Sequence, residues 1–172
     1  MSKRALTKYL QGLPKEELES QILDLYNRFK PVKEYYNFVF NPKEDQLIEE
    51  AKFKIANEYF PVKRKKPRLR RSVAQQYIKK FLLLEMDPSL VADLMLFNLE
   101  TAQRYNDKKR INQEAFYKSM FNSFQQAVVF IQVNGLDTVY RKRLTSILAM
   151  AWDQEWMNAE GLDRVFHGSF AQ

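Results

Sequence analysis

The sequence has 172 residues, of which 45% are hydrophobic and 14% aromatic, enough for one domain with a substantial core. Its formal net charge is +7, from 28 Lys and Arg against 21 Asp and Glu. The chain has no cysteine, which excludes disulfides, thiol catalysis and thiolate metal sites. The N-terminus lacks the apolar segment of a signal peptide, and the longest apolar runs are too short to cross a bilayer. We therefore expect a cytoplasmic protein that does not enter a membrane.

Apolar residues recur at helical spacing along most of the chain, and strand-like alternation is almost absent. With only four glycines, the sequence predicts an all-α protein of eight to nine short amphipathic helices. Short connections between such helices favour either an orthogonal bundle or a short α-solenoid. We expect a single helical domain over residues 1–172.

The N-terminal third of the sequence predicts four helices, which its prolines separate. The second of them carries a clear apolar stripe, formed by Leu18, Ile22, Leu25 and Phe29. The four predicted segments are Lys3–Gln11, closed by Gly12 in a left-handed conformation, the stretch between Pro14 and Pro31, the aromatic segment 32–40, and the stretch between Pro42 and Pro61.

A basic connector at 61–71 comes next. Without its seven cations, the remaining 21 Lys and Arg equal the 21 Asp and Glu, so this strip carries the whole formal charge excess. Pro61 and Pro67 keep it extended, which excludes a basic recognition helix. Ser72 and Gln75 have the spacing of a capping box, so a helix is predicted to start at Ser72. The seven cations are Lys63, Arg64, Lys65, Lys66, Arg68, Arg70 and Arg71.

Three explanations of the basic connector stay open. Cations just before a helix start oppose the helix dipole, so a negative group is expected nearby. That group is either an external anion, such as phosphate or a nucleic-acid backbone held by the seven cations and Ser72, or an internal acid. The internal acids that the sequence suggests lie at 44–50 and at 16–19. The third explanation is a loop whose cations are only solvated.

The second half of the sequence contains one segment that is apolar nearly all round, Ser89–Tyr105, which we expect at the centre of the fold. Asp87 and Pro88 provide its N-cap and first turn. Two long helices follow, separated at Asn134-Gly135, and Asp137 is predicted to cap the second of them.

The end of the sequence predicts an aromatic stripe and one more short helix. Trp152 and Trp156 are predicted to lie with Leu148 on one face of the last long helix, as part of the core. The tail at 167–172 is expected to fray.

Most signals of an enzyme are absent. The sequence has no nucleotide-binding, nucleophile-elbow or zinc-protease motif, and its one histidine, His167, lies near the C-terminus. Asp163 is four residues before it, a spacing that favours a surface ion pair over a metal site, which needs a third ligand. Asp93 and Glu100 are predicted to share one face of the most apolar helix. We favour a structural role, in which Asp93 bonds an arginine, a tyrosine or a helix end, over acid–base catalysis.

Four fragments in order carry a family resemblance: "LPKEELESQILDLYNRF", "VKEYYNFVFNP", "AKFKIANEYFP" and "RLRRSVAQQYIKKF". Over about 13–81 the chain resembles an uncharacterised bacterial family of helical domains of unknown function. The resemblance implies a soluble helical protein with no established activity and brings no catalytic residues. It also implies that a basic residue shortly before "SVA" is part of the family pattern, matched here by Arg68, Arg70 and Arg71.

The sequence therefore favours a non-enzymatic helical protein-interaction or scaffolding module, whose partner is another protein. The alternative is a non-specific binder of nucleic acid, phosphate or another polyanion through residues 63–71. An enzyme that uses buried carboxylates is the third hypothesis. We predict no catalytic residue, no metal and no cofactor, and the pattern favours no particular oligomeric state.

Overall fold

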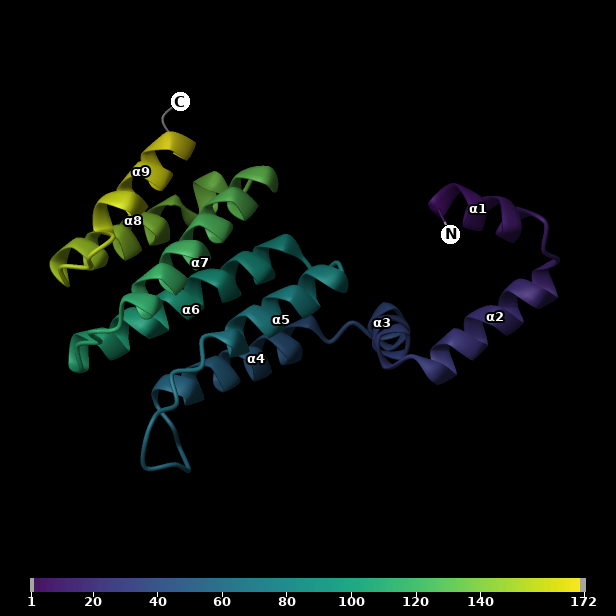
Figure 1. Cartoon of the computed structure of the whole chain (residues 1–172), viewed down its shortest axis with the longest axis horizontal. Coiled ribbons are helices and arrows are strands. Elements are labelled where there is room, and N and C mark those ends of the chain that lie inside the picture. The colour runs from purple at the N-terminus through teal and green to yellow at the C-terminus, as the bar shows by residue number, and fades with distance from the viewer. Residues whose placement is uncertain (1, 171–172) are drawn as a thin grey trace. The chain divides into compact units, whose positions relative to one another are not determined.

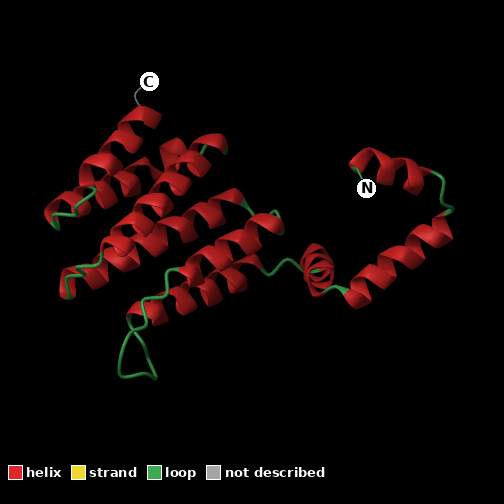
Figure 2. Cartoon of the chain, in the orientation of Figure 1, coloured by secondary structure: helices red, strands yellow, loops and turns green. Residues whose placement is uncertain are grey.

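The structure is a computed structural model that describes residues 2–170, and this range contains helices and loops but no strand (Figure 1, Figure 2). The all-α prediction is therefore confirmed. No helix in the described range is both long and apolar enough to pass through a membrane. The helices are α1 (Lys3–Gln11), α2 (Lys15–Arg28), α3 (Lys30–Phe40), α4 (Glu44–Tyr59), α5 (Ser72–Leu83), α6 (Pro88–Lys108), α7 (Glu114–Val133), α8 (Asp137–Asp153) and α9 (Ala159–Phe170).

The chain divides after Lys43 into two compact units. The N-terminal unit, residues 2–43, contains α1, α2 and α3, and the C-terminal unit, residues 44–170, contains the other six helices. The single domain expected for residues 1–172 stays a prediction. Of the tail expected to fray, residues 167–170 belong to α9, and residues 171–172 lie outside the described range.

Helix α6 is the central element of the C-terminal unit. It packs against α4, α5, α7 and α8, and Figure 1 shows these helices running beside it. More than half of its 21 residues are buried, including Val91, Leu94 and Leu99. The prediction that the apolar segment Ser89–Tyr105 lies at the centre is confirmed. A helix that is apolar all round must be surrounded, because any free face would leave apolar surface in water.

Buried amides fix the register of α6 against its neighbours. The side chain of Gln103 donates to the backbone carbonyl of Ile147 in α8 over 2.7 Å. The Asn106 side chain donates to Gln154 over 2.9 Å and accepts from the backbone N–H of Ile111 over 2.8 Å. Because an unpaired buried polar group costs about 1–3 kcal/mol, these bonds select one register of the helices.

The sequence signals at helix starts had mixed outcomes. Asp87 caps α6 as predicted, since its carboxylate accepts from the backbone N–H of Ser89 over 2.7 Å. Helix α5 does begin at Ser72, but the predicted capping box is wrong. Arg71 takes the N-cap position with helical backbone angles, and the Gln75 side chain donates to Ser123 in α7 over 3.2 Å. A tertiary contact has replaced the local one.

Two further predictions about helix ends are wrong. Gly12 ends α1 with a φ of −88°, so it is not left-handed. Asp137 is the first residue of α8 and makes no capping bond, because the N-cap position belongs to Leu136. The predicted break at Asn134-Gly135 is confirmed. There Gly135 has a φ of +65°, the left-handed conformation that glycine adopts without strain.

The prediction that both tryptophans share a helix face with Leu148 is wrong. Helix α8 ends at Asp153, and Glu155 has a φ of +52°, which turns the chain. Trp156 therefore lies beyond the helix, 4% exposed, where its ring meets Phe116 and Tyr117 of α7 edge to face. Trp152 is 48% exposed.

Candidate functional site

The basic connector folds back onto the last turn of α4. The backbone carbonyl of Glu58 accepts from the N–H groups of Arg68 and Leu69, each over 3.1 Å. These bonds close the segment at its base, and in Figure 2 it is the green loop that extends from the helices between α4 and α5. In the structure this segment is a loop without helix, between α4 and α5.

The side chain of Glu58 pairs with two cations of this loop. Its carboxylate accepts two hydrogen bonds from the Arg70 guanidinium, at 2.9 and 2.8 Å, and lies 3.5 Å from Nη2 of Arg64. Glu58 is only 4% exposed. The hydrogen bonds from Arg70 hold the pKa of Glu58 below its ordinary value, despite the opposing effect of burial. Internal pairing therefore exists at this site.

The acid that pairs with the connector was not foreseen from the sequence. The expected partners lay at 44–50 or 16–19, whereas the structure uses Glu58. A signal was available, because Glu58 is seven residues after Ala51 and three after Ile55, on the buried stripe of α4. A carboxylate on a buried face needs a cation, and the basic connector that follows supplies it.

The other five cations of the predicted anion site make no ion pair with any described residue. Lys63, Lys65, Lys66 and Arg68 are exposed, and Arg71 is half-buried near the hydroxyl of Tyr59. Ser72, the eighth residue of that prediction, is exposed at the start of α5 and makes no capping bond. The connector thus combines an internal anchor with a set of solvated cations. Anion binding by these residues stays a prediction.

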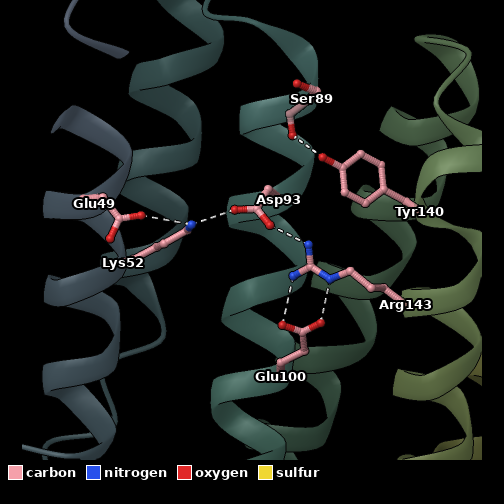
Figure 3. A network of polar contacts seen from close by, with 7 residues as sticks. All are labelled: Glu49, Lys52, Ser89, Asp93, Glu100, Tyr140 and Arg143. Carbon is pink, nitrogen blue, oxygen red and sulfur yellow. Dashed lines mark hydrogen bonds and ion pairs between the residues drawn. The ribbon is translucent and has the colours of Figure 1, made fainter. Parts of the chain in front are cut away.

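A second charged cluster joins α4, α6 and α8 (Figure 3). Arg143 of α8 holds two carboxylates of α6: its Nη1 donates to Asp93 over 2.5 Å, while Nε and Nη2 donate to Glu100 over 2.8 and 2.9 Å. Lys52 of α4 approaches Asp93 from the other side at 2.8 Å and also lies 3.1 Å from Glu49. The predicted shared face of Asp93 and Glu100 is confirmed, as is the expected bond from Asp93 to an arginine.

The electrostatics of this charged cluster fit a structural clamp. Burial raises the pKa of Asp93, but hydrogen bonds from Lys52 and Arg143 outweigh burial and leave the pKa below its ordinary value. A general acid at neutral pH needs the opposite shift. Within the described residues, no group of three or more His, Asp and Glu side chains is arranged to hold a metal ion. His167 lies 3.6 Å from Asp163 within α9, as the spacing predicted.

The N-terminal unit differs from the rest of the chain in its burial. None of the residues in α1, α2 or α3 is buried, although all three helices are amphipathic. Of the stripe predicted for the second helix, Leu18, Ile22 and Leu25 lie on α2 and Phe29 follows its last residue; Leu18 is half-buried and the other three are exposed. The large apolar side chains exposed in this unit are Leu6, Tyr9, Ile22, Leu23, Leu25, Phe29, Tyr35, Val39 and Phe40.

Within the N-terminal unit the Gln21 side chain of α2 donates to the Tyr9 hydroxyl of α1 over 2.9 Å, and the aromatic contacts lie at the α2–α3 corner. The rings of Tyr26 and Tyr36 have centroids 6.5 Å apart, and the Tyr26 hydroxyl donates to the Asn37 side chain over 3.2 Å. Phe40 stacks on Tyr36 at 6.3 Å yet stays 83% exposed. These contacts set the corner between the two helices but give the unit no core.

Comparison with known proteins gives one match. A family model described as a family of unknown function, DUF6155, matches residues 1–170, which includes both units. The expected resemblance to an uncharacterised family is confirmed, and it extends well beyond residues 13–81. Neither the curated proteins nor the solved structures contain a significant match.

We predict that Glu58→Gln lowers the free energy of unfolding by about 1–3 kcal/mol at pH 7, because it removes the charge that holds Arg70 and Arg64. The folded-state pKa of Glu58 is lowered, so its stabilisation is complete above the unfolded pKa and is lost as pH falls through the folded value. The difference between wild type and variant in urea unfolding should therefore shrink between about pH 5 and pH 3. Glu50→Gln, on an exposed residue of the same helix, is the control and should change stability by less than about 0.5 kcal/mol. A difference that is independent of pH would contradict the assignment.

We also predict that Arg143→Met lowers the unfolding free energy by about 1–3 kcal/mol, because Glu100 loses its cation and Asp93 keeps only Lys52. Arg143→Lys keeps the charge without the two-bond geometry, so its loss should be intermediate. The matched control is Lys142→Met on the exposed side of α8, with little change expected. Urea denaturation followed by far-UV circular dichroism measures all three variants. Equal stability of Arg143→Met and wild type would show that the cluster is not a clamp.

Proposed function

For this chain, which belongs to the DUF6155 family of unknown function, we propose a role as a helical protein-interaction module. The observation that carries this proposal is the N-terminal unit, in which three amphipathic helices expose large apolar side chains and bury none. In a monomer such a surface leaves apolar side chains in contact with water, which is unfavourable in free energy. Exposed apolar patches of this kind mark interaction sites.

The energetics support binding through this surface. Full burial of one Leu or Phe side chain contributes about 1.5–3 kcal/mol, so a few of the exposed side chains are enough for a specific complex. A segment of about 40 residues is also too small to stabilise itself with a core of its own, which makes association the usual route to stability. Phe40 and Leu23, at 83% and 61% exposure, are the best candidates for anchors.

The proposal predicts that Leu23→Gln combined with Phe40→Gln abolishes the complexes that the full chain forms in its own cells. Glutamine keeps the helix propensity while removing the apolar surface, so the helices should persist in circular dichroism. Chemical cross-linking in intact cells, followed by mass analysis of the tagged chain, should show species heavier than 20.6 kDa for wild type and the free chain for the double variant.

A matched control places the same change on the C-terminal unit. Leu83→Gln combined with Val139→Gln removes side chains that are 69% and 63% exposed, and it should leave the cross-linked species intact. Cross-linked species that survive the N-terminal change, or that are lost equally in both variants, would contradict a role for the N-terminal unit.

The basic connector favours a second candidate function, the binding of phosphate groups on a polyanion. Two buried polar atoms, one in the connector and one at the adjoining end of α4, have no hydrogen-bond partner among the described residues: Nη1 of Arg64 and the hydroxyl of Tyr59, a side chain that is 2% exposed. Burial raises the pKa of Tyr59 to about 12, so at neutral pH this hydroxyl stays a donor. Unpaired donors in and next to a loop that also carries solvated cations favour an anion as their partner.

For this second candidate, a short fluorescent DNA duplex should bind with a log affinity that falls against log salt with a slope near −4 to −6. Replacing Lys63, Lys65 and Lys66 with Gln should make that slope shallower by about 3. The matched control replaces Lys109, Lys118 and Lys142, exposed cations elsewhere on the C-terminal unit, and should leave the slope unchanged. Absence of binding at about 50 mM salt would contradict this function.

A further inference from the structure

We propose that the N-terminal unit pairs with the N-terminal unit of a second copy of this chain. This inference rests on the proposed function and names the partner of the same surface. Two independent features support it: the size of the exposed apolar surface, and a charge pattern that is complementary to itself.

The charge pattern places cations on one helix and acids on the next. Helix α1 carries Lys3, Arg4 and Lys8 and no acid, and none of the three makes an ion pair with a described residue. The first turns of α2 carry Glu16, Glu17 and Glu19. Of these acids only Glu19 pairs with a described residue, Lys15 at 3.5 Å, and both side chains are mostly exposed. The chain thus leaves charges of both signs uncompensated within one short unit.

A dimer with two-fold symmetry can bring the cations of α1 against the acids of α2. In an isologous dimer both copies use the same patch, so if α1 of one copy lies against α2 of its partner, the reverse contact forms at the same time. Lys3, Arg4 and Lys8 then face Glu16, Glu17 and Glu19 twice. Complementary charges arranged in this way at an interface fix the register of the two partners and disfavour other partners.

The apolar side chains fit the same arrangement. Leu6 and Tyr9 are three residues apart on α1, and Leu18, Ile22 and Leu25 follow one face of α2 at spacings of four and three. These are the spacings that let helices interdigitate. A standard interface takes about 20–30 residues from each partner, and helices of 9, 14 and 11 residues supply that number.

The same charge pattern disfavours other occupants. An anionic membrane or a nucleic acid attracts α1 but is repelled by the three glutamates that begin α2. A second copy of the chain offers acids to the cations of α1 and cations to the acids of α2 from a single surface.

A charge-swap experiment on the purified full chain tests this inference. Sedimentation of wild type over a range of concentrations should show a reversible monomer–dimer equilibrium. One variant carries Lys3→Glu, Arg4→Glu and Lys8→Glu, so that both of its helices are acidic. The other carries Glu16→Lys, Glu17→Lys and Glu19→Lys, so that both are basic. Each variant alone should dimerise at least about tenfold more weakly, because like charges meet across the axis.

Mixing the two variants should restore a dimer of wild-type strength, because every α1–α2 contact is again between opposite charges. A chain that carries all six changes should also dimerise with itself. These rescues separate the inference from simple misfolding, because a variant that cannot fold is not rescued by its counterpart.

Several results would overturn the second-copy inference. One is a wild-type monomer at about 100 µM, well above a micromolar dissociation constant. Others are variants that fail to rescue each other, or binding of the monomer to phosphatidylserine vesicles. If the chain is monomeric but its cross-linked species in cells depend on Leu23 and Phe40, the interaction role stands and the partner is a different protein. If those species are also insensitive to Leu23 and Phe40, the proposed function fails as well.

Discussion

The burial of α6 is the constraint on which the C-terminal unit depends. Buried residues cover most of the circumference of α6, so four helices pack around it. The few polar groups on α6 must then find partners among those neighbours. Asp93 and Glu100 meet Arg143 and Lys52, while Gln103 and Asn106 meet the end of α8. These polar contacts determine how each neighbour is aligned along the helix.

Much of the fold could be predicted from the sequence where one local rule acted alone. Prolines and Gly135 separated the helices correctly, and Asp87 capped α6 because nothing else competed for its carboxylate. The errors arose where a tertiary contact competed. Gln75 donates to Ser123 of α7 and does not cap its own helix. Trp156 lies beyond the end of α8, against Phe116 and Tyr117 of α7. Helix periodicity cannot anticipate such contacts, because they depend on which helices become neighbours.

Only part of each candidate site could be predicted from the sequence. The density of cations at 63–71 was obvious, but their anchor was a single acid outside every acidic cluster. Glu58 can be identified by its position on the buried stripe of α4. Periodicity gives that position, but the prediction requires noticing that a charged residue occupies it. For the N-terminal unit, the apolar stripes on α1 and α2 correctly predicted amphipathic helices. Amphipathicity specifies that a face will be covered, but it does not specify by what.

The closed base of the basic connector has a consequence for how this family can vary. Because Glu58 binds Arg68, Leu69 and Arg70, the two ends of the loop are fixed together whatever lies between them. Doubling the length of such a loop costs only about 0.6 kcal/mol, so its tip is under little pressure from stability. Lys65 and Lys66 are exposed and make no ion pair with a described residue, so they can change without displacing helices α4 and α5, whereas Arg64 is held by Glu58. Whatever those cations contact can evolve independently of the fold that carries them.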